Sequence, residues 1–285
     1  AEELQAKIEA LKKRRQDYQD MQDQMEDTGE SQISLTDGDA RSMFAGTGQA
    51  QTVGYNVQIA VDDKHKLIVD HEVVNEGVDS AQLGPMAVRA KEALQVEHLE
   101  VLADKGYYRS EEISRCVEEG IVPYVPKANT SSNSHSGLYG KQDFRYDPAH
   151  DCYWCPAGCA LAYRFESTKR GRIIRYYATQ ACKDCDLRRR CTRNRYGRRI
   201  WRWVDERVLD DMDERIRAQP EKVKRRKSIV EHPFGTIKHS MHQGHFLTRG
   251  LENVRSEMSL TILAYNIKRV INLLGTRELM AARAA

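Results

Sequence analysis

The chain is 285 residues long, and 40% of its residues are hydrophobic and 31% are charged. This length and composition are sufficient for one large domain or two modest ones, each with its own core. No run of about 18 apolar residues occurs, which excludes a membrane-spanning helix from the printed sequence, and the polar, charged N-terminal stretch is unlike a signal peptide.

The formal net charge of +3 is unevenly distributed along the chain. Between Arg164 and Arg202, 14 Lys and Arg residues stand against three Asp and Glu residues, which gives this block a net charge of +11. The rest of the chain has 31 basic and 39 acidic residues, a net charge of −8. A basic block on an otherwise acidic chain predicts a face that meets a polyanion, and a solvated surface is the alternative interpretation.

The N-terminal residues 2–27 are rich in strong helix formers and predict a long helix. Its sparse apolar stripe is typical of a coiled-coil-like arm and consists of Leu4, Ile8, Leu11, Tyr18 and Met21. Because the sequence opens with Ala1 inside this helical pattern, we expect it to be a piece of a longer protein. Residues 28–52 are rich in Gly, Ser, Thr and Asp and predict a loop.

Strand and helix patterns then alternate in the order hairpin, helix, strand, helix, strand. The predicted ranges are strands 55–61 and 67–74, a helix over 80–94, a strand over 99–103, a helix over 110–119 and a strand over 121–125. This order predicts an α/β fold whose sheet has an antiparallel edge and a parallel centre.

The second half of the chain begins with a polar loop over 127–150 and a cysteine-rich basic segment that ends near Trp203. Helical patterns follow over 205–218, 221–242 and 251–274. Pro233 interrupts the second of them, so we expect either a kink at Pro233 or a new helix that starts there. No internal repeat is evident.

Asp104 is the first candidate for chemistry. It ends the predicted strand 99–103 within the segment VLADKGYY, and a carboxylate at the C-terminal end of a central parallel strand lies at the crevice where α/β sheets bind ligands. Gly106 allows a sharp turn after it. An Asp that merely ends a strand or caps a helix is the alternative interpretation.

Glu231 is the second candidate. Lys224, Lys227, Glu231 and Lys238 are spaced so that they share one face of a helix. A carboxylate flanked by lysines suits a metal ligand beside a track of phosphates, whereas spacing alone equally suits a surface stripe of ion pairs.

Five segments together resemble the DDE transposase domain of bacterial insertion sequences, which belongs to the retroviral-integrase and ribonuclease-H superfamily. They are LADKGYY, VEHPFGTIK, GYNVQIAVD, TDGDARSM and LTILAYNIKRVINLLG. The resemblance covers roughly residues 33–275. It implies a ribonuclease-H-like mixed sheet with flanking helices, and a transposase that cleaves DNA and joins it by strand transfer.

The resemblance also implies a site of three carboxylates that holds two Mg²⁺ ions, or Mn²⁺, for in-line attack on a phosphodiester. Carried over to this chain, Asp104 is the second acid, Glu231 is the third, and Lys238 grips a DNA phosphate. The family places Tyr and Arg before the Glu, and here Lys224 and Lys227 stand at those offsets, so that this part is only a charge-preserving match.

The first acid of the family is harder to place. A ribonuclease-H sheet has three antiparallel strands before its first helix, with the first acid on strand one, and this sequence shows only two. Asp62 would then lie at the turn between strands two and three, distant from Asp104. We therefore expect the first Asp upstream of Ala1, with residues 2–27 the tail of an inserted helical segment. Asp62 is the alternative, and Asp37 and Asp39 are outside candidates.

Six of the seven cysteines lie within Cys152–Cys191, where metal ligation is favoured over disulfides. Paired knuckles about 26 residues apart suit tetrahedral Zn²⁺. The resemblance selects Cys155, Cys182, Cys185 and Cys191. The competing set replaces Cys191 with Cys152, and reduced thiols without metal are the third possibility. Cys116 stands alone in a predicted helix and is expected in the core.

The basic block interleaves arginines with aromatic residues, a pattern that suits contact with phosphates and stacking on exposed bases. We expect Arg198, Arg199 and Arg202 to bind DNA, in an insertion that clamps DNA near the cut. The remaining residues of this pattern are Arg172, Arg175, Tyr176, Tyr177, Trp201 and Trp203.

The expected organisation has four parts: a helical arm over 1–30, the first part of the catalytic core over 31–126, the cysteine-rich insertion over 127–204 and a helical completion over 205–285. The resemblance implies a homodimer on paired DNA ends in the bacterial cytoplasm. The alternatives are a zinc-ribbon DNA-binding module without catalysis and a plain nuclease of the same fold. Asp104 and Glu231 distinguish them, since two bridged ions need carboxylates within about 4–8 Å.

Overall fold

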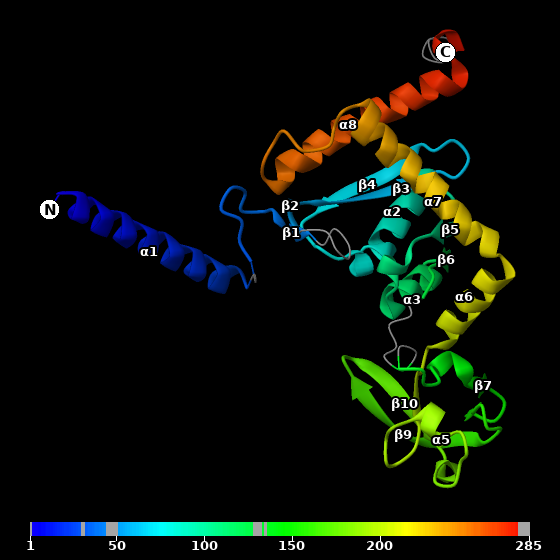
Figure 1. Cartoon of the computed structure of the whole chain (residues 1–285). Coiled ribbons are helices and arrows are strands. Elements are labelled where there is room, and N and C mark those ends of the chain that lie inside the picture. The colour runs from blue at the N-terminus through cyan, green and yellow to red at the C-terminus, as the bar shows by residue number, and fades with distance from the viewer. Residues whose placement is uncertain (1, 30–31, 44–50, 128–132, 134–135, 279–285) are drawn as a thin grey trace. The chain divides into compact units, whose positions relative to one another are not determined.

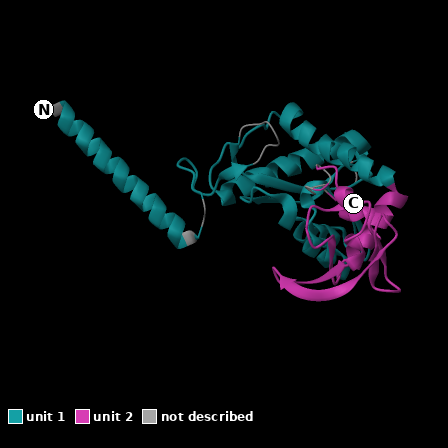
Figure 2. Cartoon of the chain, turned by 60° about the horizontal axis from the view of Figure 1, so that its bottom comes forward, with its two compact units in different colours: residues 1–123, 220–285 teal, residues 124–219 magenta. Residues whose placement is uncertain are grey.

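The computed structural model describes residues 2–29, 32–43, 51–127, 133 and 136–278. The chain divides into two compact units (Figure 2). Unit 1 comprises residues 1–123 and 220–285, and unit 2 comprises residues 124–219. The expected cysteine-rich insertion, 127–204, falls within unit 2, which also includes the helix that follows it. Among the described residues, no helix is both long and apolar enough to cross a bilayer.

Unit 1 opens with the predicted arm, which is a helix, α1 (Glu2–Thr28). Its apolar stripe is exposed, with Leu4 at 65% and Leu11 at 64% of their possible surface. Within the predicted loop over 28–52 there is one short strand, β1 (Arg41–Met43), which pairs antiparallel with β2 (Thr52–Gly54).

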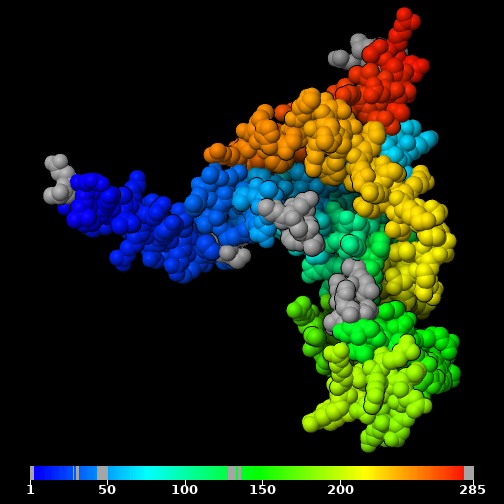
Figure 3. Space-filling view, in the orientation of Figure 1, coloured from blue at the N-terminus to red at the C-terminus, as the bar shows by residue number. Residues whose placement is uncertain are grey.

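The predicted hairpin is confirmed as β3 (Asn56–Val61) and β4 (Ile68–Val74), which pair antiparallel. Period-two alternation gives the hairpin two different faces. The apolar face carries Val57 and Ile59 and packs against α8 (Leu251–Leu274). Figure 1 draws α8 alongside the hairpin, and the space-filling view of Figure 3 shows these segments against each other. The polar face meets α2 (Leu83–Leu94), where Arg89 bonds Asp70 and Glu72 of β4.

The remaining predicted elements of unit 1 are also present, as β5 (Leu99–Leu102), α3 (Ser110–Glu118), β6 (Ile121–Tyr124) and α7 (Pro220–Gly235). The structure adds helical turns that were not predicted as separate elements, which are η1 (Asp79–Ala81), η2 (Lys105–Tyr107) and the π-helical turn η5 (Thr236–Ser240). β5 and β6 form a two-stranded sheet that is separate from the β3–β4 sheet among the described strands. Cys116 is fully buried in α3, as expected for a core residue, and burial raises its pKa to about 12.

Pro233 does not end its helix. α7 continues through it to Gly235, and the π-helical turn follows directly. Pro233 is buried, so its ring packs into the core in place of the backbone hydrogen bond that it removes.

Unit 2 contains an antiparallel sheet of five strands in the order β11-β10-β9-β8-β7. The strands are β7 (Arg145–Asp147), β8 (Cys152–Trp154), β9 (Ala160–Lys169), β10 (Arg172–Ala178) and β11 (Arg199–Trp203). Three helical turns, η3 (Lys141–Asp143), η4 (Gln180–Cys182) and α5 (Arg188–Cys191), and the helix α6 (Arg207–Ala218) complete it. The sheet packs around a small core of Phe144, Tyr153, Leu161, Tyr177, Cys191 and Ile200.

Candidate functional site

Asp104 lies directly after β5, at the start of the turn η2. Its Oδ1 accepts a hydrogen bond of 2.7 Å from the amide of Gly106. A Cβ atom on Gly106 would lie 2.9 Å from that same oxygen, so a side chain at this position would require the Asp104 carboxylate to shift. Arg226 of α7 forms an ion pair with Asp104, with its Nη1 3.9 Å from Asp104 Oδ2.

A second carboxylate, that of Asp79, lies beside the same glycine. The position of a Gly106 Cβ would be 3.6 Å from Asp79 Oδ2, and the other oxygen of Asp79 accepts hydrogen bonds of 2.8 Å from Asn56 and Gln58 of β3. Gln58 is buried and in turn accepts a hydrogen bond from the Tyr107 hydroxyl. This network ties β3 and η1 to the turn that carries Asp104.

Burial is the main cause that raises the pKa of Tyr107, and the charges of Asp79 and Asp104 raise it further. Tyr107 therefore stays a neutral donor. Asp79 was not among the residues predicted for the site. The available signal in the sequence was Gln58. This amide occupies a strand position that is buried in the structure, and a buried amide requires hydrogen-bond partners nearby.

Glu231 lies on the outer side of α7. The buried residues of this helix are Ile229 and Pro233, and Arg226 faces Asp104 from the same side. At 100° per residue, Glu231 points about half a turn away from that buried stripe. Its side chain is 66% exposed and pairs with Lys227 at 3.7 Å. The structure thus brings Arg226, rather than Glu231, next to Asp104.

The lysines expected beside Glu231 are all exposed. Lys224 pairs with Glu221 at 2.8 Å, and Lys238 lies in the π-helical turn with its ammonium 5.7 Å from the centre of the Phe234 ring. Glu231, Lys224 and Lys227 do share one helix face, as their spacing predicts. The described residues include no group of three or more His, Cys, Asp or Glu side chains that could hold a metal ion.

The candidates for a first acid take part in local structure. Asp62 lies in the β3–β4 turn and accepts a hydrogen bond from the His65 amide. Asp37 accepts hydrogen bonds from the Tyr55 hydroxyl at 2.8 Å and from the Gly250 amide, and Asp39 accepts one of 2.8 Å from the Leu251 amide.

Asp37 and Asp39 thus satisfy backbone amides at the N-terminus of α8, where negative charge is favoured. Partial burial alone would raise the pKa of Asp37, but its hydrogen bonds, that from Tyr55 foremost, hold the pKa below its ordinary value.

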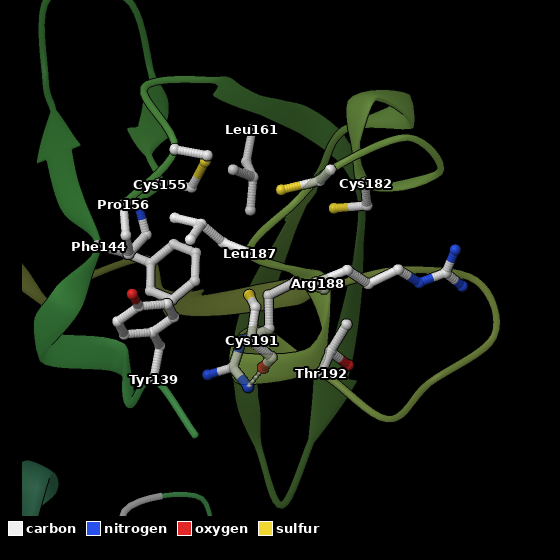
Figure 4. Close-up of a pocket in the computed structure, with 13 residues that line it drawn as sticks. Tyr139, Phe144, Cys155, Pro156, Leu161, Cys182, Leu187, Arg188, Cys191 and Thr192 are labelled. Atoms are coloured by element: carbon white, nitrogen blue, oxygen red, sulfur yellow. Dashed lines mark hydrogen bonds between the residues drawn. The ribbon is translucent and has the colours of Figure 1, made fainter. Parts of the chain in front are cut away.

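Four cysteines of unit 2 line one cavity (Figure 4). Cys155 follows β8, Cys182 and Cys185 lie in and after η4, and Cys191 ends α5, with Phe144 and Leu187 among the apolar lining residues. None of these thiols forms a disulfide. Burial chiefly raises the pKa of Cys191; the Arg198 cation opposes this, and the neighbouring thiols add to it.

Cys152, the competitor of Cys191 for the fourth position, is buried in β8 and does not line this cavity. Burial chiefly raises the pKa of Cys152; Asp147 and Asp151 add to this, and Arg145 opposes it. Burial also raises the pKa of Cys159, and there the further contributions come from Cys155, Cys185 and Cys182. The amide of Cys159 donates to Cys155 Sγ at 3.3 Å.

The three arginines expected to bind DNA have different environments. Arg202 is buried: it pairs with Asp210 at 2.5 Å, and its guanidinium lies 3.8 Å from the centre of the Tyr146 ring. Arg198 is half-buried over Phe144, at 5.2 Å from the ring centre. Arg199 is exposed. Of these three arginines, Arg199 is the most accessible to a ligand.

Comparison with protein families gives one match. Residues 154–271 match the family model described as "Transposase DDE domain". The matched segment includes the four cavity cysteines and Glu231, and it begins after Asp104. No curated protein and no solved structure matched the chain.

Proposed function

Because residues 154–271 carry the transposase DDE domain, we propose that the chain is the larger part of a transposase catalytic region that cleaves DNA and joins it by strand transfer. The family match carries this proposal. Asp104 supports it from outside the matched segment, because it lies at the end of a strand, where α/β folds bind their ligands. Asp104 and Glu231 act as acids of the site, and a homodimer holds paired DNA ends.

The described carboxylates do not form a divalent-metal site as they stand. Asp104 faces Arg226, and Glu231 faces outward. A full site would hold Mg²⁺ or Mn²⁺ through Asp104, Glu231 and a first acid, and the metal would stabilise the charge that develops on the phosphate oxygens. No step is derived through it here, because the donor set is incomplete.

The arrangement of strands supports a first acid from outside these residues. Among the strands that the structure describes, β3–β4 and β5–β6 are two separate two-stranded sheets, whereas a ribonuclease-H-like sheet is continuous. One strand between β3 and β5 would join them and would place its side chains beside Asp79 and Asp104. We propose that this strand, with the first acid, precedes Ala1. The Asp62 side chain is occupied by the turn in which it lies.

The donor chemistry of the cavity in unit 2 fits Zn²⁺. Cys155, Cys182, Cys185 and Cys191 approach it from three separate turns, and thiolates in two knuckles are the usual ligands of structural zinc. We propose that these four bind one Zn²⁺ and fix the turns around the sheet. Their side chains must rotate to do so, since the sulfurs do not form a closed ligand group in this structure.

One observation favours a second function. The outward position of Glu231, away from Asp104, is what a zinc-ribbon DNA-binding module without catalysis would tolerate, whereas a nuclease would not. In that case unit 2 alone would account for the activity of the chain.

Cleavage assays separate the two functions. We expect the 285-residue chain to bind DNA without cutting or joining it, and Asp62→Asn to change little. In a parent protein that extends upstream of Ala1, Asp104→Asn and Glu231→Gln should each abolish cleavage and leave binding nearly intact. Glu221→Gln is the matched control, because this exposed carboxylate on the same helix pairs only with a surface lysine.

Two outcomes would contradict the assignment. Robust Mg²⁺-dependent cleavage by the 285-residue chain that is lost in Asp62→Asn would make Asp62 the first acid. Cleavage by the parent that survives both Asp104→Asn and Glu231→Gln would remove these residues from the site. If the parent protein cleaves no DNA at all, the binding module is favoured instead.

A further inference from the structure

The three long strands of unit 2 sort the residues of the basic block onto two faces. β10 pairs with both β9 and β11, so that residues in register across the strands point to the same side. On one side, Tyr177 and Ile200 are neighbours and are buried in the core. On the other side, one row crosses the three strands: Phe165, Tyr176 and Trp201.

This row, here called the aromatic row, is largely accessible. Phe165 is 41% and Trp201 is 52% exposed. The rings of Phe165 and Tyr176 stack, with 4.7 Å between their centres and 19° between their planes. Aromatic side chains of this size normally contribute to a core or an interface, so a row of them at the surface indicates a contact with a ligand.

Cations flank the aromatic row. The Arg199 guanidinium lies 5.2 Å from the centre of the Phe165 ring and 5.8 Å from that of Tyr176. The Lys141 ammonium lies 4.5 Å from the centre of the Trp201 ring but pairs with Glu206, so the charge that the row offers a ligand comes from Arg199. The strands and turns that surround the row carry the block of net charge +11. The ligand must therefore combine negative charge with flat apolar surfaces.

Unpaired nucleotides have both properties. Their phosphates carry the charge, and their bases offer a face for stacking that a duplex hides between neighbouring base pairs. A duplex satisfies the cations but not the rings. We propose that the aromatic row binds unpaired DNA, with bases stacked on Phe165 and Trp201 and phosphates held by Arg199. This inference rests on the proposed function, since DNA cut at an element end must be opened or frayed to supply such bases.

The test compares two ligands for one protein. Binding of the 285-residue chain to a labelled single-stranded oligonucleotide and to the duplex of the same sequence is measured by fluorescence anisotropy at one fixed salt concentration. Loss of one stacked base weakens binding about 10-fold, within the range of aromatic-to-alanine changes. We expect Phe165→Ala and Trp201→Ala each to weaken single-strand binding by about that factor and to leave duplex binding unchanged.

Tyr163→Ala is the matched control. Tyr163 lies on the same strand as Phe165 and has a similar exposure, 43%. A register shift of β9 against β10 between these two positions pairs Tyr163 with Tyr177, on the opposite side of the sheet from Tyr176. It should leave both affinities unchanged. Trp201→Phe keeps a ring at the end of the row and should retain most of the single-strand affinity, which guards against a general loss of folding in Trp201→Ala.

The outcomes separate this inference from the proposed function. One result would overturn the aromatic row alone. In it, the wild type binds duplex DNA, but Phe165→Ala and Trp201→Ala either leave the single-strand affinity unchanged or lower it no more than they lower the duplex affinity. Equal affinity for an RNA strand of the same sequence would overturn the assignment to DNA. Failure of the wild type to bind either form of DNA would overturn both proposals.

Discussion

Two arginines of β11, Arg202 and Arg199, should lose very different amounts of stability when each is replaced by Met. Arg202 is buried, pairs with Asp210, and hydrogen-bonds the Tyr153 hydroxyl at 3.3 Å, whereas Arg199 is exposed. Burial alone would lower the pKa of Arg202, but these partners, Asp210 first, raise it above its ordinary value. The folded state therefore holds Arg202 as a cation, and the fold depends on its charge.

The magnitude follows from the contacts that Arg202→Met removes. A hydrogen bond to a charged group contributes about 1.5–3 kcal/mol, and the cation over the Tyr146 ring about 1 kcal/mol. Because Asp210 is 44% exposed, water takes over part of the lost pairing, and we expect a net loss of about 2–3 kcal/mol. Arg199→Met should cost no more than about 0.5 kcal/mol, as is usual at the surface.

Urea unfolding followed by tryptophan fluorescence measures this difference in stability, because the signal reports on unit 2, where both arginines lie. The chain has three tryptophans, Trp154, Trp201 and Trp203, and all lie in unit 2. With a slope of about 1–1.5 kcal/mol per molar urea, Arg202→Met should lower the midpoint by roughly 2 M. Equal midpoints for Arg202→Met and Arg199→Met would refute the argument that sheet register decides which arginine holds the fold.

The remaining predictions concern metal and pH. The purified chain should carry about one Zn²⁺, and Cys182→Ser or Cys185→Ser should remove the metal and loosen residues 150–200. Cys152→Ser is the control and should retain the metal. Metal content is measured by atomic absorption, and retention of Zn²⁺ in both Cys182→Ser and Cys185→Ser would contradict the proposed zinc site. Asp37→Ala should cost about 1 kcal/mol in thermal or urea unfolding, as for other lost helix caps. The pKa of Asp37 in the folded state lies below the ordinary 3.8. Its contribution to stability is therefore present above that pH and is lost as the pH falls through the folded pKa. The stabilities of wild type and variant should converge in acid, and a constant difference between them down to pH 2 would contradict this argument.

The helices and the first hairpin could be predicted because their apolar residues follow one period. In β3, Val57 and Ile59 alternate with polar residues, and one face packs against α8. The sheet of unit 2 was not predicted. In β9, nine of ten side chains are exposed, because most of this strand extends beyond the small core, so no apolar alternation marks it. The turn after it, Arg170-Gly171, with both φ angles positive, was the available signal for a hairpin.

The candidate site was harder to predict than the elements that carry it. Spacing correctly placed Lys224, Lys227 and Glu231 on one face of α7, but spacing alone does not say which face meets the sheet. Ile229 and Pro233, the buried residues of that helix, mark the packed face in this structure, and Arg226 lies on the same side and faces Asp104. Asp79 was missed because its partners Asn56 and Gln58 are distant in sequence and meet it only in the fold.

The charge of the basic block also has two uses that composition cannot separate. Arg202 is occupied by Asp210 within the core side of the sheet, and Arg175 lies 3.7 Å from Glu166 and 3.8 Å from Asp151. These cations neutralise carboxylates of the protein, so they release no counterions when DNA binds. The number of phosphates that the basic block can neutralise is therefore smaller than its 14 Lys and Arg residues suggest. Alternation along β10 and β11 thus divides one run of arginines between holding the sheet together and offering charge to DNA.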